Sequence, residues 1–561
     1  MGDSLRHLRV LALDAQASGA TPAYGDLIEL GWGVCSAEGP AGAPQTRWVI
    51  PRTRRPIGRA VRELTGWSEA VLKEAVEEAD AWTLLRREIT RSFGEDPSAP
   101  VPTVIHFARF EQPFLRDLHE RLDSAAPYPF DTVCLHAVAA RFLPDLPRRN
   151  IRALAGYFGH SPELLRRSSG HVEATAFIWR GLVPLLEAAG VRTWSELKQW
   201  LCDAAPARRS ARRSFPLAAE TRRSLPDAAG VYRFLRPNGQ IVYVGKAVSL
   251  KKRVASHFKS RGPATERSLE LLSQVHAIDH TETASLLEAA LLETDEIKRL
   301  DPPYNVQLRS GERSAWFASR DLRDTRPAPD DAHPLGPLPS ERALSGLPAL
   351  AALADGAEPS RALLAAALAV PAEFLPDRTL FDEGFEIFSA EHLARHEPDT
   401  LRRITGASLA LWLARGRVEL ESPLETAPGE WDLARVRRRL ERALVQGGLL
   451  LRRARLLALL ADADVAFREA PHPQTRALAV AGTKISSRHD LENVAALASL
   501  PRRRAPALRT RQAAFDAAAY DRMRVLLTEL RRIFDESGEI AVRTGGHLLE
   551  GERLARVLRA V

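Results

Sequence analysis

The chain has 561 residues, of which 45% are hydrophobic and 27% charged, a balance typical of a globular protein of about two to four domains. No apolar run reaches the roughly eighteen residues of a membrane span, and the first residues lack the apolar core of a secretory signal. Cys35, Cys134 and Cys202 lie far apart, which excludes a disulfide framework or a clustered zinc site and is typical of a reducing cytosol.

The formal net charge of +8 favours polyanion partners only weakly. Only eight of the 79 basic residues are lysines, and five of those eight lie between Lys246 and Lys298. A GC-rich genome is the simplest explanation for the excess of arginine and alanine. Because lysine and arginine differ in hydration and geometry, the lysine cluster still directs attention to its surroundings.

Residues 8–190 alternate strand-like and helix-like patterns. Strands are predicted in LRVLALD, GDLIELGWGVCSAEG, TRWVIP and PTVIHF. Helices are predicted in EAVLKEAVEEADAWTLLRREITRSF, EQPFLRDLHERLD and VEATAFIWRGLVPLLEAAG. This order predicts a first α/β domain over residues 1–202.

Composition marks two boundaries further along the chain. Residues 203–223 are rich in Ala, Pro, Ser and Arg and are predicted to be a basic linker, either solvated or in contact with phosphates. Residues 224–310 form a compact second unit, and residues 311–345 a Pro-rich connector. Residues 346–561 are predicted to be mostly helical, with WDLARVRRRLERALVQGGLLLRRARLLALLADA the clearest helix and TRALAVAG a candidate strand.

The second unit begins with a hairpin pattern. Two strand-like runs, 230–235 and 240–245, flank RPNG, in which Asn238-Gly239 is a strong turn signal. The hairpin would bring Tyr232 close to Tyr243. A helix with basic spacing follows, and residues four apart on it, such as Arg253 and His257, share a face.

These side chains suit phosphodiester hydrolysis. A carboxylate such as Glu293 can hold one Mg²⁺, and an arginine fork such as that of Arg253 can hold phosphate oxygens. A tyrosine near a lysine such as Lys246 can have its pKa lowered and accept a proton from water. Taken singly, such residues are more often core or surface positions, so their joint occurrence in order carries the interpretation.

The ordered elements GVY, YVGKA, LKKR, HF, E and PPYN resemble a GIY-YIG nuclease, most of all the amino-terminal module of UvrC and of its Cho-type relatives. The resemblance covers residues 224–310. It implies a metal ligand, Glu293, and a general base, Tyr232, helped by Lys246, with Arg253 stabilising the phosphate and Asn305 helping to fix the site. It also places Tyr243, His257 and the motif glycines Gly230 and Gly245 in the site, although UvrC-like sequences more often have tyrosine at the position of His257.

The first domain resembles a DEDD-type 3′–5′ exonuclease of the polymerase-proofreading kind over residues 8–190. The elements that carry this resemblance are LDAQ, DLIELG, VIHFARFEQPFL and NIRALAGYFGH…HVEATAF. Members of that family hold two Mg²⁺ ions with four carboxylates and activate water with a histidine. The resemblance therefore implies a ribonuclease H-like mixed sheet with helices and a two-metal site at its strand ends.

The exonuclease site is degenerate when its positions are compared one by one. Asp14 occupies the first carboxylate position, but Gln16 stands at the second and supplies no charge. Glu111 occupies the third with one extra methylene. Arg166 falls at the histidine position and His171 at the last aspartate; a gapped alignment would make His171 the base and leave the aspartate missing. We expect no efficient two-metal site.

These patterns predict an α/β multidomain DNA endonuclease that depends on Mg²⁺ or Mn²⁺ and acts in DNA repair, with DNA as partner. The exonuclease-like domain is expected to bind DNA or another repair or replication protein, although fold analogy is a weak guide here. A bifunctional exonuclease/endonuclease and a non-catalytic DNA-binding scaffold remain alternatives. No membrane partner is predicted, and the expected location is the cytoplasm, in association with the nucleoid.

Overall fold

The computed structural model describes residues 4–53, 55–94, 99–161, 165–203, 213–259, 263–306, 315–344, 346–393, 399–421, 430–469, 474–501, 507–536, 538–544 and 547–559. Residues 204–212 of the predicted basic linker and the start of the Pro-rich connector lie outside these residues. No helix among them is long and apolar enough to cross a membrane.

The chain forms two compact units, which we describe separately. The N-terminal unit comprises Met1–Ala228, Tyr232–Gly245 and Ser249–Thr281. The C-terminal unit comprises Ala229–Val231, Lys246–Val248 and Glu282–Val561. The predicted second domain, 224–310, therefore contributes segments to both units.

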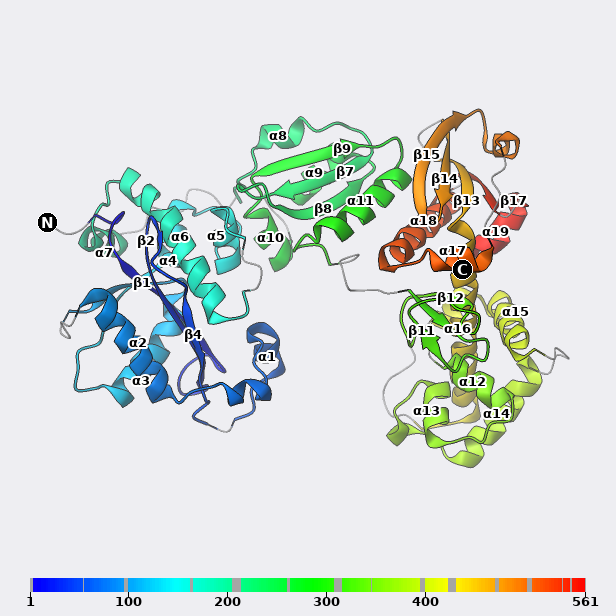
Figure 1. The fold of residues 1–561 in the computed structure, drawn as a ribbon, viewed down its shortest axis with the longest axis horizontal. Helices are drawn as coiled ribbons and strands as arrows, with labels where there is room; N and C mark the ends of the chain where they lie inside the picture. Colours follow the sequence, from blue (N-terminus) through cyan, green and yellow to red (C-terminus); the bar gives the residue numbers. More distant parts are fainter. Residues whose placement is uncertain are drawn as a thin grey trace. The chain divides into compact units, whose positions relative to one another are not determined.

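A mixed sheet forms the centre of residues 1–202 (Figure 1). Strand β1 pairs antiparallel with β2 and parallel with β5, and β5 pairs parallel with β6. The order is β3-β2-β1-β5-β6, with β4 also paired to β2. The strands are β1 Val10–Ala17, β2 Leu27–Ser36, β3 Gly39–Pro40, β4 Gln45–Trp48, β5 Val101–Ile105 and β6 Phe130–Cys134.

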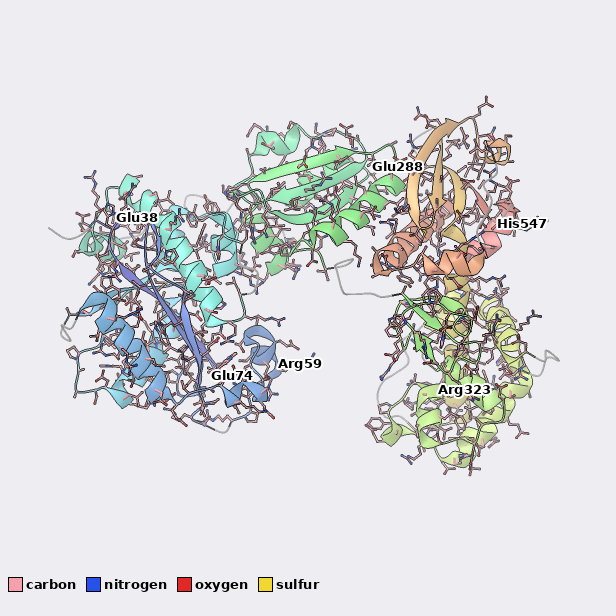
Figure 2. The ribbon with its side chains drawn as sticks, viewed as in Figure 1. Glu38, Arg59, Glu74, Glu288, Arg323 and His547 are labelled. Carbon is pink, nitrogen blue, oxygen red and sulfur yellow. The ribbon has the colours of Figure 1, made fainter. Side chains whose placement is uncertain are left out.

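The period of two in β1 decides where its polar end points. Val10 and Ala12 belong to the buried cluster on one face, which α6 (Ser168–Ala188) covers, and Leu11 and Leu13 to the cluster on the other face. Side chains alternate along a strand, so Asp14 follows the α6 face. Charged side chains such as Glu38, Arg59 and Glu74 lie on the outside of this domain (Figure 2).

The helices of this region largely follow the predicted segments, with one break. The predicted helix over 69–93 is interrupted, because Val76 forms a parallel bridge with Val49 and donates its N–H to Trp48 O at 2.9 Å. The helices are α1 Arg59–Thr65, the 3-10 helix η1 Glu69–Lys73, α2 Glu78–Phe93, α3 Ala108–Leu122, α4 Leu135–Phe142, α5 Ile151–Tyr157, α6 Ser168–Ala188, α7 Trp194–Cys202 and α8 Ala219–Arg223. Helix α8 lies within the segment predicted as linker.

The predicted hairpin is present. Its turn closes through Gly239 N–H to Arg236 O at 3.0 Å, with Pro237 fixing the second position and Gly239 in the left-handed region at φ 81°. The three-stranded sheet has the order β8-β7-β9. Its elements and the helices that follow are β7 Gly230–Leu235, β8 Ile241–Ala247, α9 Leu250–His257, α10 Glu266–Leu272, β9 Ala277–Glu282 and α11 Leu286–Leu300.

The described residues from 315 onward contain long helices, as predicted, and two sheets of which only one strand was predicted. The smaller sheet lies within the predicted Pro-rich connector. The three-stranded sheet has the order β11-β10-β12, and the five-stranded antiparallel sheet the order β15-β14-β13-β16-β17. The strands are β10 Trp316–Ala318, β11 Thr325–Arg326, β12 Leu335–Leu338, β13 Ala463–Arg468, β14 Thr475–Ala481, β15 Lys484–Leu491, β16 Glu539–Thr544 and β17 His547–Glu550. The candidate strand TRALAVAG is β14.

Helices surround these sheets within the C-terminal unit. They are α12 Leu347–Ala354, α13 Arg361–Leu368, α14 Arg378–His392, α15 Thr400–Glu421, α16 Leu433–Leu460, α17 Leu508–Ala513, α18 Ala517–Asp535 and α19 Gly551–Arg559. One buried cluster joins Leu287 and Leu291 of α11 to Leu526 and Leu530 of α18. Helix α11, which follows β9 in sequence, therefore shares a hydrophobic core with the five-stranded C-terminal sheet.

Candidate active site

Two tyrosines, an arginine and a histidine gather on β7, β8 and α9 within the N-terminal unit. Tyr232 Oη lies 2.7 Å from His257 Nε2, and Arg253 hydrogen-bonds to the hydroxyls of Tyr232 and Tyr243. The two tyrosine ring centroids are 6.0 Å apart. Ser249 caps α9 by accepting from Lys252 N at 3.2 Å, which fixes the start of the helix that presents Arg253 and His257.

Gly245 makes this packing possible. A Cβ atom at this position would lie 2.6 Å from Tyr232 Oη and 2.9 Å from Tyr243 Cε1, closer than real side chains approach. The motif glycine is therefore explained by the space that the two rings need.

Burial sets the protonation states of the group. The sequence suggested a lowered pKa for the tyrosine base, but burial raises the pKa of Tyr232 well above its ordinary value. Its hydroxyl is therefore protonated at neutral pH. Burial, with the nearby charge of Arg253, lowers the pKa of His257 to about 4, so its imidazole is neutral. A neutral imidazole offers one ring nitrogen as an acceptor, and the Tyr232 hydroxyl can donate to Nε2 when the proton is on Nδ1.

The predicted metal ligand has a defined neighbour within the C-terminal unit. Glu293 Oε1 accepts a hydrogen bond from the backbone N–H of Lys246 at 3.0 Å. Glu293 is half-buried on α11, whose first turn is capped by Ser285. A partly exposed carboxylate with one oxygen oriented by the backbone suits Mg²⁺, which binds through one or two carboxylates and keeps several waters.

The other motif residues, Gly230 and Asn305, lie at the start of a strand and in a turn. Gly230 begins β7. Asn305 is 6% exposed and lies in the turn after α11, where its N–H donates to Pro302 O at 3.2 Å. The turn follows Asp301, which ends α11 in the left-handed conformation at φ 41°.

A second polar site lies at the ends of β1 and β5 in the exonuclease-like domain. Glu111 Oε2 accepts from Ala15 N at 2.9 Å, and His171 Nδ1 lies 3.0 Å from Asp14 Oδ1. These residues line a cavity of about 740 Å³. Its wall also contains Gln16, His106, His136, Phe107, Phe110, Arg148, Arg149 and Arg152.

The electrostatics of this cavity fit a two-metal centre poorly. Burial, with the charge of Asp14, raises the pKa of Glu111 well above its ordinary value. Burial opposes charge on His171, but the Asp14 carboxylate raises the pKa of the imidazole overall, which favours the protonated ring beside Asp14. Within the described residues, Asp14 Oδ2 and Gln16 Oε1 are buried without a hydrogen-bond partner, and only the first belongs to a carboxylate.

The structure corrects one detail of the sequence interpretation. Arg166, which the exonuclease pattern placed at the histidine position, has an exposed side chain, and only its carbonyl contacts the site, by accepting from Gln16 Nε2 at 2.8 Å. His171, in contrast, lies at the site next to Asp14.

Glu29 was missed by the sequence analysis. It is fully buried on β2, opposite Gln16 in the strand register, and its Oε2 accepts from Ser168 N at 2.8 Å at the start of α6. Its other oxygen accepts from Thr46 Oγ1 at 3.0 Å and pairs with Arg167. Glu29 therefore positions the helix that carries His171. The sequence did contain one signal for Glu29, because it is the single acidic residue in the otherwise apolar strand β2.

Comparisons with known proteins find similarity to nucleases. Residues 228–306 match the family of UvrC-like GIY-YIG domains. A protein of Mycobacterium tuberculosis described as a candidate bifunctional exonuclease/endonuclease is 32% identical over 220 residues, which cover 39% of this chain and 33% of the relative. The UvrABC system protein C of Methylococcus capsulatus is 49% identical over 86 residues, covering 15% of this chain and 14% of the relative.

Solved structures similar to part of this chain include two nuclease domains. The GIY-YIG N-terminal endonuclease domain of UvrC from Thermotoga maritima, bound to its catalytic divalent cation, is 30% identical with a TM-score of 0.15, covering 16% of this chain and 93% of that one. The nuclease domain of 3′hExo, a DEDDh family member bound to rAMP, is 12% identical with a TM-score of 0.27, covering 33% and 94%.

Residues 228–306 thus match a UvrC-like GIY-YIG domain, as the sequence predicted, and part of the chain is similar to a candidate bifunctional exonuclease/endonuclease. The chain spans only about a third of the length of the mycobacterial relative and about a seventh of the UvrC protein.

Proposed function

We propose that this protein is a metal-dependent DNA endonuclease that hydrolyses a phosphodiester bond in DNA repair, by a UvrC- or Cho-like incision. The observation that carries this proposal is the match of residues 228–306 to the UvrC-like GIY-YIG family, together with the contacts among its motif residues. Strand β8 carries both Tyr243 and Lys246. The tyrosine group and the Lys246–Glu293 contact therefore belong to the same family domain.

Tyr232 and His257 are proposed to act as one proton-accepting unit. Tyr232 is fully buried and protonated at neutral pH, so it does not act as a free phenolate. If its oxygen takes a proton from water, its own proton passes to Nε2 of the neutral His257, 2.7 Å away. The pair then holds one extra proton, on the imidazole, and the hydroxide formed attacks phosphorus.

The remaining residues supply charge and orientation. The guanidinium of Arg253 is oriented by two tyrosine hydroxyls and would hold the phosphate oxygens through its fork. Lys246 adds a second positive charge. Glu293 would hold Mg²⁺ or Mn²⁺, which when bound polarises the phosphate and stabilises the leaving oxygen.

The exonuclease-like domain is proposed to bind DNA or a partner repair or replication protein rather than to degrade 3′ ends. Arg148, Arg149 and Arg152 lie beside its cavity and would attract a phosphate backbone, while the charge balance around Asp14 is unfavourable for two metal ions. An enzyme that acts in this way would work in the cytoplasm, in association with the nucleoid.

Purified protein should cut nicked, flapped or adducted DNA when Mg²⁺ is added, and chelation should stop the cutting. Salt-sensitive binding without cleavage on any of these substrates would favour the non-catalytic scaffold instead. Release of mononucleotides from 3′ ends would favour a bifunctional exonuclease/endonuclease.

A further inference from the structure

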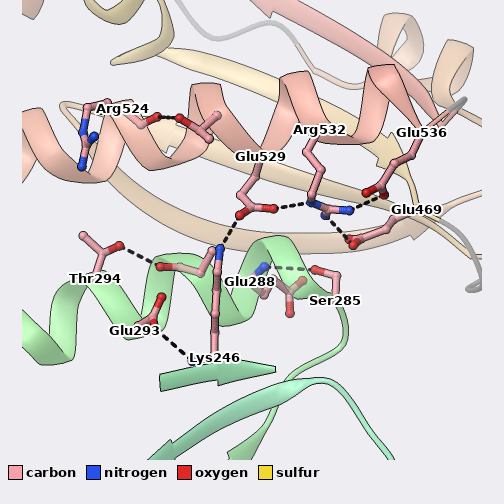
Figure 3. A network of polar contacts seen from close by, with 12 residues as sticks. Lys246, Ser285, Glu288, Glu293, Thr294, Glu469, Arg524, Glu529, Arg532 and Glu536 are labelled. Carbon is pink, nitrogen blue, oxygen red and sulfur yellow. Dashed lines mark hydrogen bonds and ion pairs between the residues drawn. The ribbon is translucent and has the colours of Figure 1, made fainter. Parts of the chain in front are cut away.

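Lys246 is held at both ends within the C-terminal unit. Its backbone N–H donates to Glu293, and its ammonium group forms an ion pair with Glu529 on α18. Figure 3 shows the Lys246 side chain extending from β8 past α11 to Glu529. Lys246, a residue of the nuclease motif, therefore contacts both the candidate metal ligand Glu293 and helix α18.

Glu529 is fixed independently of Lys246. Its side chain is only 5% exposed, and its second oxygen accepts from Arg532 Nε at 2.7 Å. Arg532 in turn donates to Glu469 Oε1 at 2.5 Å and to Glu536 Oε2 at 2.6 Å (Figure 3). Because three carboxylates hold this guanidinium, Glu529 keeps its position whether or not a lysine is present.

Helix α18 is also fixed against α11. Beyond the shared apolar cluster, Arg522 pairs with Asp295 at 2.7 Å and Lys298 with Asp521 at 2.8 Å. Glu288 at the start of α11 (labelled in Figure 2) pairs with Arg476 of β14 at 2.8 Å. The helix that carries Glu293 and the helix that carries Glu529 are thus joined by packing and by charge.

The geometry suits positioning of the ammonium group. A lysine side chain is a flexible stem with three N–H donors, and it offers no planar fork to orient a phosphate. Glu529 takes one donor, while the side chain of Lys246 stays 32% exposed. The ion pair with Glu529 already restricts the rotation of the lysine side chain, and its exposed side can still contact a phosphate. Binding of the phosphate therefore costs less conformational entropy.

We propose that Glu529 is a positioning residue for the nuclease reaction, which acts by orienting the Lys246 ammonium group beside Glu293. The inference rests on the proposed endonuclease function. It makes the C-terminal sheet and α18 part of the working nuclease, although this segment lies outside residues 228–306 that match the family.

The test compares single-turnover cleavage by Glu529→Gln with that by Asp295→Asn, a matched control that removes an α11–α18 ion pair away from Lys246. Glu529→Gln should cut about 10- to 100-fold more slowly, with DNA affinity and melting temperature close to those of the control. In a Lys246→Met background, Glu529→Gln should cause no further loss, because it acts through the lysine. Glu529→Asp, which keeps the charge on a shorter stem, should be intermediate.

Wild-type cleavage rates in Glu529→Gln, faster cleavage, or an added loss in the Lys246→Met background would overturn the proposal. If the wild type cuts no DNA, the endonuclease function fails, and acylation of Lys246, followed by mass spectrometry, still tests the contact. Faster modification of Lys246 in Glu529→Gln than in Asp295→Asn supports the pairing, and equal rates contradict it.

Discussion

His171 Nδ1 lies 3.0 Å from Asp14 Oδ1, so an imidazole stands beside the carboxylate that the exonuclease pattern predicts as the first metal ligand. The pairing explains why Asp14 can stay buried at 7% exposure in a cavity that has lost two of the four expected acids. Asp14 is accordingly a structural ion-pair partner in this chain.

This ion pair makes the stability of the N-terminal unit depend on pH. The pKa of His171 is raised above its unfolded value of about 6.5, so the stabilisation is complete below that pH and is lost as the pH rises through the raised value. In Asp14→Asn, the stability of the N-terminal unit should no longer fall as the pH rises through the raised pKa of His171. Thermal melting at several pH values between 6 and 9 would show it, and an identical slope in wild type and variant would contradict the assignment.

Degradation of 3′ ends should be absent. An end-labelled single strand incubated with Mg²⁺ should stay intact with wild type and with Asp14→Ala alike, because Gln16 and the raised pKa of Glu111 leave too little negative charge for two metal ions. Mononucleotide release that disappears in Asp14→Ala would prove the exonuclease site active.

Tyr232→Phe and His257→Asn should each lower the single-turnover cleavage rate by about 10²-fold or more, since general-base contributions are of that size. The double variant should be little worse than either single one, because the two side chains act as a unit. Tyr128→Phe is a suitable control, since the Tyr128 hydroxyl is buried without a partner among the described residues. If the rate losses of the two single variants add in the double variant, Tyr232 and His257 do not act as a unit.

The cleavage rate should not show a titration near pH 6.5. With a pKa of about 4, His257 stays neutral down to about pH 5 and loses its acceptor only as the pH falls through 4. Rates measured between pH 5 and 8 test this, and a limb near 6.5 that vanishes in His257→Asn would contradict the low pKa.

Gly245→Ala should destabilise the domain by about 1–3 kcal/mol and reduce cleavage, because the new methyl group would overlap both tyrosine rings. Gly42→Ala is the matched control, since a Cβ there meets nothing within 4 Å. Denaturant unfolding of the two variants measures the difference, and equal stabilities would show that the rings can move apart.

Motifs with fixed local spacing could be predicted from the sequence. The hairpin around Gly239 and the UvrC-like domain were identified because turn signals and motif residues follow one another within about 80 residues. Of the C-terminal sheet, only β14 could be predicted. Its strands β13 and β16 have six residues each, with two alanines in β13 and one in β16, and they stand beside long helical patterns that dominate the periodicity.

Long-range polar contacts were equally hidden. Glu529 is 283 positions away from Lys246, and in the sequence it is one of several acids on an amphipathic helix. Arg166 and His171 were aligned to a motif by spacing alone. The start of α6, fixed by Glu29, decides that His171 reaches Asp14 while the Arg166 side chain stays outside.

The most direct test of the endonuclease proposal is single-turnover cleavage of a flapped or adducted duplex with Mg²⁺ by wild type, Glu293→Gln and Glu288→Gln. Both substitutions remove one charge from the same helix, but Glu288 belongs to an ion pair with Arg476 and has no role in the proposed site. We predict cutting by wild type and Glu288→Gln and none by Glu293→Gln. Equal cutting by all three would contradict the account.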